Sequence, residues 1–316
     1  MPIVIEKRGL EKRPLPIERK RSGILWKLFR PHTLTASFIP VLIGTVFAWM
    51  STRTLRLGLF IAMMAASILI QAATNMFNEY FDYKRGLDTA ASVGIAGAIT
   101  QDRLKARTVF YIAWACIALA VLLGVYICAS TTWWLALIGS ALISVGYFYT
   151  GGPYPIAYSP LGELISGAAM GTGIILISYY IQTDTITWDA FLVSVPSLIL
   201  IGAIMLSNNI RDLDGDRKGG RHTLAILLGQ SKAIQLLAGM FIFSYGWIVA
   251  LILLKILPVW SLFVLLSVPK SLTAIRAYQG KHSAQEMMVG MKHVSQSNTI
   301  FGALLVIGLI IAILLQ

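Results

Sequence analysis

Two short stretches hold six of the chain's 14 acidic residues. The first lies at 75–88 and the second at 208–218, and the unit Asn-x-x-x-Asp occurs in both, at 78–82 and at 208–212. Each stretch begins at the end of an apolar run, and we expect it to run out into a loop. Two carboxylates about 6 Å apart repel each other by roughly 3 kcal/mol at an effective dielectric near 20. A loop with a purely structural role has no reason to gather several of them. The pattern therefore indicates that both stretches serve a bound cation.

Helical spacing gives the polar residues of each stretch a common direction. Residues three, four or seven positions apart share one face of an α-helix. Asn75, Asn78 and Asp82 have this spacing, so one helix face presents two amides and a carboxylate. The second stretch repeats the pattern in steps of four residues, a drift of about 40° per step: Asn208, Asp212 and Asp216.

The chemistry that suits these residue types is magnesium bound to a phosphate-bearing substrate. Oxygen-rich clusters of Asp and Asn favour a hard cation, and magnesium takes one or two carboxylates together with water and substrate phosphate. Basic residues lie between the acidic ones, where they can meet the anionic oxygens that the metal does not cover. They are Lys84, Arg85, Arg211, Arg217, Lys218 and Arg221. A solvated loop of mixed charge is the alternative for one such stretch, but two stretches with matched spacing favour the metal site.

The elements that must position these residues are membrane-spanning helices. The chain is 57% hydrophobic and 13% charged, with a mean hydropathy of +0.74. Ordinary soluble domains carry about 25% charged residues. A chain this apolar needs a lipid bilayer in place of water over most of its surface. Cys116 and Cys128 lie in one apolar segment, which indicates packing and supports neither a disulfide nor a metal site.

Apolar runs long enough to cross a bilayer need roughly 20 residues at about 1.5 Å each. Nine are present, with soft ends: 33–50, 58–78, 107–129, 133–150, 160–181, 190–208, 234–254, 258–276 and 298–316. Pro269 and Lys270 interrupt the eighth. We therefore predict an all-α polytopic membrane protein, a bundle of about nine transmembrane helices at 24–316 that follows a basic tail at 1–23.

The basic residues predict the orientation of this bundle. With the N-terminus in the cytoplasm, 23 of the 26 Lys and Arg fall on the cytoplasmic side and only Arg53, Arg56 and Lys255 fall outside. Both acidic stretches are then cytoplasmic, the C-terminus is outside, and the membrane is the plasma membrane. The net charge of +12 is an orientation signal and an attraction to anionic lipid, so no nucleic-acid partner is expected. A site for a metal-bound anion beside an apolar bundle predicts that the substrate is a lipid diphosphate.

Four motifs together resemble the UbiA superfamily of intramembrane prenyltransferases. They are Arg30-Pro-His-Thr33, the stretch at 78–88, Tyr149-Thr-Gly-Gly-Pro153 and the stretch at 208–216. The similarity runs from about residue 24 to the end and is greatest to the branch that prenylates 1,4-dihydroxy-2-naphthoate in menaquinone biosynthesis. Where the superfamily's first motif has its first Asp this chain has Glu79, and Asp88 stands two residues after the usual last position. Glu79 and Asp88 are therefore alternatives for a further metal ligand.

This resemblance implies a reaction and a set of ligands. A polyprenyl diphosphate would ionise with magnesium on its diphosphate, and the electron-rich ring of 1,4-dihydroxy-2-naphthoate would attack the allylic cation. Loss of carbon dioxide would then give demethylmenaquinone. The implied catalytic and metal-binding residues are Asn78, Asp82, Asn208, Asp212 and Asp216. Acidic positions without an assigned role are Asp214 and the two alternatives above, and His222 could bind phosphate.

Three residues are candidates for contact with the acceptor. Arg30 could meet the acceptor carboxylate or the diphosphate, with a juxtamembrane anchor as the alternative. Asn75 shares the face of the first acidic stretch. Tyr149 could shield a carbocation or handle a proton together with Glu163, although an interfacial aromatic belt also explains it.

Other functions make different demands on the sequence. Prenyl transfer to 4-hydroxybenzoate, homogentisate or haem would use the same residues and differ only in the acceptor. A secondary transporter places ionisable groups near the bilayer midplane, whereas here only Glu163 falls inside a predicted span. CDP-alcohol phosphotransferases have an Asp-Gly-x-x-Ala-Arg core, which this chain lacks.

Overall fold

The computed structural model describes residues 28–87, 97–102 and 104–315, and this part of the chain is helical with no strand. The tail at 1–23 and Asp88 lie outside the described residues. The first elements are α2 (Pro31–Thr52), α3 (Leu57–Lys84), α4 (Ala106–Ser130), α5 (Trp134–Phe148), η1 (Ile156–Tyr158), α6 (Gly162–Ser166) and the π-helix η2 (Gly167–Gly173). They are followed by α7 (Ile174–Thr183), α8 (Trp188–Lys218), α9 (Leu224–Leu228), α10 (Gln230–Leu253), η3 (Val259–Ser267), α11 (Val268–Arg276) and α12 (Ala284–Leu314).

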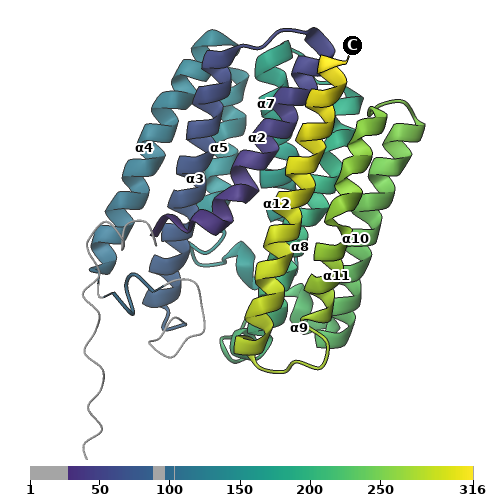
Figure 1. Cartoon of the computed structure of the whole chain (residues 1–316). Helices are drawn as coiled ribbons and strands as arrows, with labels where there is room; N and C mark the ends of the chain where they lie inside the picture. Colours follow the sequence, from purple (N-terminus) through teal and green to yellow (C-terminus); the bar gives the residue numbers. More distant parts are fainter. Residues whose placement is uncertain (1–27, 88–96, 103, 316) are drawn as a thin grey trace, which may run out of the picture.

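The helices form an elongated bundle, as expected for a multi-pass membrane protein (Figure 1). Eight helical segments of the described chain are long and apolar enough to cross a membrane. The fourth predicted span, 133–150, corresponds to α5, which has 15 residues and is about 22 Å long. A bilayer core is about 30 Å thick, so α5 is short for a full crossing and the number of nine spans stays a prediction.

Two predicted spans are not single α-helices. The span at 160–181 consists of α6, the π-helix η2 and α7. The span at 258–276 changes from 3₁₀ to α geometry between η3 and α11, with Pro269 in the first turn of α11. Proline is tolerated there because the first N–H groups of a helix have no partner within the helix.

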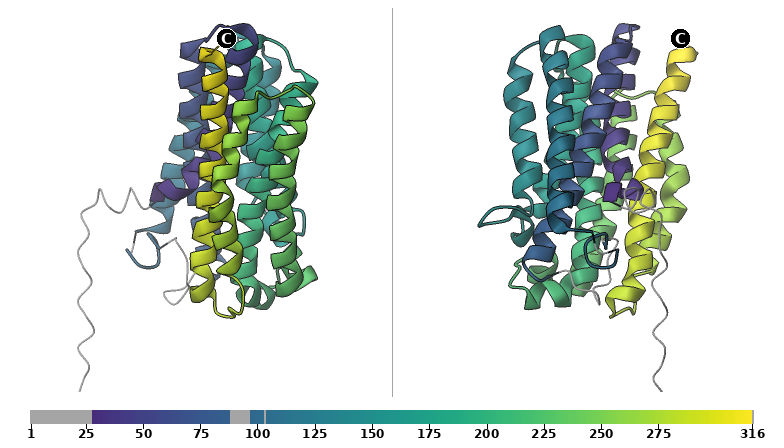
Figure 2. Two further views of the ribbon diagram at one scale, coloured as in Figure 1. Left: turned by 45° about the vertical axis from the view of Figure 1, so that its right-hand side comes forward. Right: turned by 90° about the vertical axis from the view of Figure 1, so that its left-hand side faces the viewer.

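The bundle has two packed groups with α2 and α7 between them (Figures 1 and 2). On one side α3 packs on α4, and on the other α8 packs on α10 and α12. At one end of the bundle the Arg53 guanidinium donates to the Ile313 carbonyl (3.0 Å), and Arg56 forms a bidentate pair with Asp184. The hydrogen bond from Arg56 lowers the pKa of the Asp184 carboxyl, although both side chains are half exposed. These contacts place the ends of α2, α7 and α12 and the start of α3 together.

The long helices α3 and α8 run from that end and extend past the apolar layer at the other. At 28 and 31 residues they are about 42 and 46 Å long. Both acidic stretches therefore continue as helix, and the expectation that they run out into loops is wrong for 75–84 and 208–218. No proline interrupts either stretch, and α8 ends only at Lys218, just before Gly219 and Gly220, the latter with a φ of +74°.

Glycines let the π-helix approach α8 backbone to backbone. A Cβ on Gly171 would lie 2.5 Å from the Leu198 nitrogen, and a Cβ on Gly167 would lie 2.2 Å from the Leu198 oxygen. Small residues at such contacts are what allows membrane helices to pack closely.

Gly171→Leu should therefore lower the thermal unfolding temperature of the detergent-solubilised protein. Forcing a side chain into a packed contact costs about 1–3 kcal/mol. Gly239→Leu is the matched control, because a Cβ at Gly239 meets nothing within 4 Å and leucine favours the helix. Equal unfolding temperatures for the two variants would contradict the close helix contact.

Candidate active site

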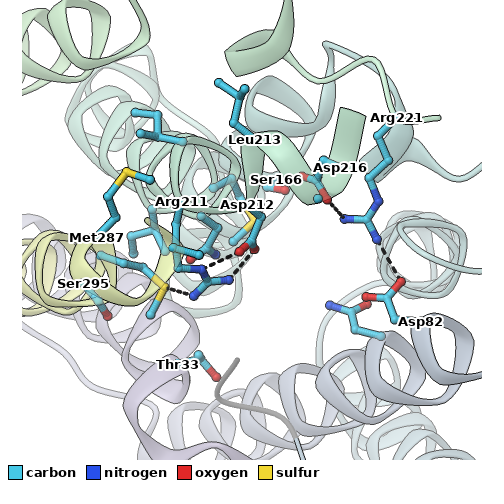
Figure 3. Close-up of a pocket in the computed structure, with 18 of the residues that line it drawn as sticks. Thr33, Asp82, Ser166, Arg211, Asp212, Leu213, Asp216, Arg221, Met287 and Ser295 are labelled. Carbon is cyan, nitrogen blue, oxygen red and sulfur yellow. Dashed lines mark hydrogen bonds and ion pairs between the residues drawn. The ribbon is translucent and has the colours of Figure 1, made fainter. Parts of the chain in front are cut away.

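A cavity of about 480 Å³ lies between the two packed groups, near the ends of α3 and α8. Polar residues of both acidic stretches line it (Figure 3). They are Asn75, Asn78, Asp82, Asn208, Arg211, Asp212, Asp214 and Asp216. Because α3 and α8 remain helical there, the spacing predicted from the sequence does give each set a shared face, and the two faces meet in one cavity.

Arg221 connects the two faces. Its guanidinium lies 3.0 Å from a carboxylate oxygen of Asp82 on α3 and 3.1 Å from one of Asp216 on α8. Figure 3 shows these two contacts on one side of the cavity and the Arg211–Asp212 ion pair on the other. Burial opposes the charge of Arg221, but the two carboxylates outweigh this effect and raise its pKa above the usual arginine value. The guanidinium therefore stays charged.

The charges around the cavity favour an additional cation. Four carboxylates line it, against the guanidinium groups of Arg30, Arg211 and Arg221. Asp216 is 6% exposed, and its Oδ2 atom is buried without a hydrogen-bond partner among the described residues. Such an oxygen is costly unless a ligand satisfies it.

The side chains available as metal ligands suit magnesium better than a metal that is held by protein ligands alone. Within the described residues no three His, Cys, Asp or Glu side chains converge into a closed metal cluster. Magnesium needs only one or two carboxylates when water and substrate phosphate complete its shell. Asn78 also qualifies as a ligand, since its Oδ1 accepts one hydrogen bond from the Thr150 hydroxyl (2.7 Å) and an amide oxygen has two lone pairs.

Only part of the predicted diphosphate-binding set reaches this cavity. Arg211 and Arg221 line it, whereas the four other basic residues are absent from its lining: Lys84, Arg85, Arg217 and Lys218. Arg85 instead donates to the backbone carbonyls of Thr150 and Gly152 and lies over the rings of Phe81 and Tyr158. Its guanidinium thus holds the segment after α5 against α3.

The structure separates the acidic positions whose roles were open. Glu79 is 4% exposed and lies outside the cavity lining; its Oε1 accepts the Ile99 N–H at 2.9 Å. Glu79 thus makes a structural contact, whereas Asp214 lines the cavity. His222 is exposed, and its backbone N–H donates to the Tyr158 carbonyl (2.8 Å).

The three acceptor candidates all line the cavity. Arg30 lies at the start of α2 with a φ of +48°. The Asn75 amide donates to the Thr33 hydroxyl at 2.8 Å, which ties α3 to α2. The Tyr149 hydroxyl lies 3.2 Å from the Met205 sulfur. Glu163 is buried outside the lining and accepts a hydrogen bond from Asn209 (2.9 Å).

The sequence reasoning missed several residues of the cavity wall. Gln71 and Thr74 continue the polar face of α3 toward the membrane centre, and their spacing from Asn75 and Asn78 could have revealed them. His282, in the loop before α12, also lines the cavity. No local pattern marks it, because the loop before α12 reaches the site only through the fold.

A second, mostly apolar cavity of about 230 Å³ adjoins the first. The two share five lining residues: Gln71, Thr74, Tyr149, Ser166 and Met170. From this junction the second cavity runs along α5 to Trp133 and Leu135, at the far end of that helix, and residues of α3, α4, η2 and α7 also line it. The site thus joins a charged chamber to an apolar one.

Comparisons of the sequence with known proteins all point to one family. The model of the UbiA prenyltransferase family matches residues 37–296. The chain is 52% identical to a 1,4-dihydroxy-2-naphthoate octaprenyltransferase of Bacillus subtilis, over 96% of this chain and 97% of that protein. It is 26% identical to the protein of that name from Mycobacterium tuberculosis, over 82% and 87% of the two chains.

Solved structures share the fold. A UbiA homolog from Aeropyrum pernix superposes with a TM-score of 0.67 at 16% identity, covering 87% of this chain and 97% of that one. A UbiA homolog from Archaeoglobus fulgidus, bound to GPP and Mg2+, gives 0.62 at 15% identity, with 89% and 99% coverage.

The contact between Glu79 and Ile99 can be tested by hydrogen exchange. Glu79→Ala should speed exchange of the Ile99 amide, because a buried N–H without an acceptor costs about 1–3 kcal/mol. Glu79→Gln keeps an oxygen acceptor and should preserve both the protection and most of the enzyme activity. Loss of activity in Glu79→Gln with the amide still protected would instead indicate a role for Glu79 in metal binding.

Proposed function

The chain belongs to the UbiA prenyltransferase family, and on this premise we propose that its charged cavity binds magnesium and a polyprenyl diphosphate. The reaction is transfer of the polyprenyl group to 1,4-dihydroxy-2-naphthoate with loss of diphosphate and carbon dioxide, a step of menaquinone biosynthesis. Its direct product is the quinol form of demethylmenaquinone, because no oxidant takes part. The observation that carries the proposed site is the meeting of the Asn and Asp faces of α3 and α8 beside an apolar cavity. An amphiphilic donor with a diphosphate head needs both chambers.

The residues proposed to hold magnesium are Asn78, Asp82, Asn208, Asp212 and Asp216. The metal supplies Lewis acidity, which stabilises the negative charge that develops on the leaving diphosphate. Three guanidinium groups, those of Arg30, Arg211 and Arg221, line the same chamber and can donate to phosphate oxygens. Lys84, Arg217 and Lys218 remain candidates only for the approach of the anion, since they do not line the chamber.

The junction between the cavities is where the allylic carbon of the donor is expected. Tyr149, which lines both cavities, presents an aromatic ring near this point, and such rings stabilise cations. A phenol keeps its proton at neutral pH, so Tyr149 acts as a hydrogen-bond donor rather than as a base. The apolar wall keeps water away from the reactive carbon.

The acceptor is proposed to enter the charged chamber beside α2. Its carboxylate requires a cation, and Arg30 provides one at the wall that also contains Asn75 and Thr33. Because electron density of the dihydroxynaphthoate ring forms the new carbon–carbon bond, the chain needs no nucleophilic side chain. His282, on the opposite loop, is a further polar group available to the acceptor.

The proposed location is the plasma membrane with the charged chamber on the cytoplasmic side. Most Lys and Arg residues of the sequence fall at this end of the predicted spans, as the positive-inside rule requires. The proposed transmembrane domain is 24–316, and the tail at 1–23 would add attraction to anionic lipid.

Asp82→Ala and Asp212→Ala should each lower turnover by about a hundredfold or more, the scale for removing a group that stabilises developing charge. The assay follows diphosphate release and prenylated product from purified protein with a polyprenyl diphosphate and dihydroxynaphthoate, with and without magnesium. Asp189→Ala is the matched control, because Asp189 is an exposed carboxylate at the opposite end of α8.

Three results would change the proposal. Full activity of folded Asp82→Ala and Asp212→Ala would remove these residues from the site. Product with 4-hydroxybenzoate or homogentisate alone would keep the mechanism and change the acceptor. A folded protein that prenylates none of these acceptors would favour a transporter.

We further propose that the donor tail lies in the second cavity. Gly139 on α5 lines it, and a Cβ there meets nothing within 4 Å. Gly139→Leu should therefore fill the cavity without disturbing the backbone and lower turnover of long donors about tenfold, the scale of a mismatch in an apolar pocket. Dimethylallyl diphosphate should be affected little.

The measurement is the ratio of turnover with a long and a short donor. Gly239→Leu, outside this cavity, should leave the ratio unchanged. An equal loss with both donors in Gly139→Leu would contradict this location of the tail.

A further inference from the structure

Arg221 occupies an unusual place among the charged residues of the cavity. It lies in the segment after α8 and outside both acidic helices, yet it forms ion pairs with a carboxylate of each. Its side chain is 13% exposed, against 21% for Asp82 and 9% for Asp216. The single positive charge of Arg221 thus reduces the repulsion between two carboxylates on different helices, a role that a bound metal ion could otherwise fill.

The local chain conformation aims Arg221 at the cavity. Gly220 adopts a left-handed conformation, after which the Arg221 N–H donates to the Asp216 carbonyl (3.0 Å). The guanidinium lies over the ring of Tyr158, 4.9 Å from its centre. The backbone turn and the aromatic ring hold the side chain independently of the two carboxylates, so its position does not depend on a metal.

The ion pairs leave part of the hydrogen-bonding capacity of both partners unused. The Arg221 Nε and the Asp216 Oδ2 are buried, and neither has a hydrogen-bond partner among the described residues. A guanidinium has five N–H donors and a carboxylate has two acceptor oxygens. The unused donor suits an anion and the unused acceptor suits a cation, and a metal diphosphate supplies both.

We propose that Arg221 is a resident counter-ion that competes with the metal until the diphosphate arrives. Without diphosphate its guanidinium neutralises Asp82 and Asp216 and so weakens metal binding. With diphosphate it exchanges carboxylate oxygens for phosphate oxygens, which it can bind in the same bidentate way, and both carboxylates become available to the metal. Metal and diphosphate then bind cooperatively, so this inference rests on the proposed function.

A purely structural role for Arg221 makes the opposite prediction for one measurement. If the guanidinium merely holds the carboxylates in position, its removal weakens both metal and diphosphate binding. If it competes with the metal, its removal strengthens metal binding and weakens diphosphate binding. Changes of opposite sign in the two affinities therefore distinguish the two roles. The size expected is that of coupling between two sites, typically a factor of about 5 to 150.

The experiment uses the full chain in detergent and two titrations. The first measures the affinity for Mn²⁺, a paramagnetic substitute for magnesium, without diphosphate. The second measures the affinity for inorganic pyrophosphate at saturating Mn²⁺. Arg221→Gln should bind Mn²⁺ about tenfold more tightly than the wild type and pyrophosphate about tenfold more weakly, within the range for coupled sites.

Two further variants sharpen the comparison. Arg221→Lys keeps the charge but lacks the planar fork that spans both carboxylates, so its Mn²⁺ affinity should lie between those of the wild type and Arg221→Gln. Arg107→Gln removes one exposed arginine at the start of α4 and should change neither affinity, which controls for net charge. Thermal unfolding of each variant establishes that it is folded.

The outcomes separate this inference from the proposed function. Equal or weaker Mn²⁺ binding by folded Arg221→Gln, with a wild type that binds Mn²⁺ and forms product, would overturn the counter-ion role alone. A wild type that binds no Mn²⁺ even with pyrophosphate would overturn the metal site and this role with it.

Discussion

Repulsion between carboxylates is the constraint on which the site depends. The faces of α3 and α8 bring Asp82, Asp212, Asp214 and Asp216 to one cavity, beside an apolar bundle that screens charge poorly. The protein offsets this repulsion with two guanidinium groups: Arg211 pairs with Asp212, and Arg221 pairs with Asp82 of α3 and Asp216 of α8. A divalent cation would complete the compensation, and a diphosphate would then find positive charge on every side.

The lengths of the helices separate water-exposed chemistry from apolar binding. Because α3 and α8 exceed the thickness of the bilayer core, their ends carry charged residues beyond the apolar layer while their middle turns remain within it. The charged cavity and the apolar cavity adjoin along this boundary, at Thr74 and Tyr149. An amphiphilic substrate can therefore keep its diphosphate near water and its tail in an apolar environment.

Several polar residues of the motifs hold the structure together around the site. Arg85 binds backbone carbonyls after α5, Glu79 accepts a backbone N–H of the following loop, and Asn75 donates to Thr33 on α2. Each satisfies a backbone or side-chain group that would be costly to bury alone. A motif of this kind thus combines ligands for the substrate with contacts that position the helix bearing them.

The sequence predicted the membrane class, the approximate positions of the long helices and the shared faces of the two acidic sets, because composition and helical periodicity are local properties. It also placed Asn78, Asp82, Asp212 and Asp216 in one proposed site. Which guanidinium groups face the cavity depends on how the helices pack: Arg221 contacts Asp82, 139 positions away along the chain, while Arg85 donates to backbone carbonyls. Packing likewise buries Glu79 and brings His282 to the wall of the cavity. The direction of a side chain at a helix end is set by packing against segments distant in sequence, and no local pattern contains that information.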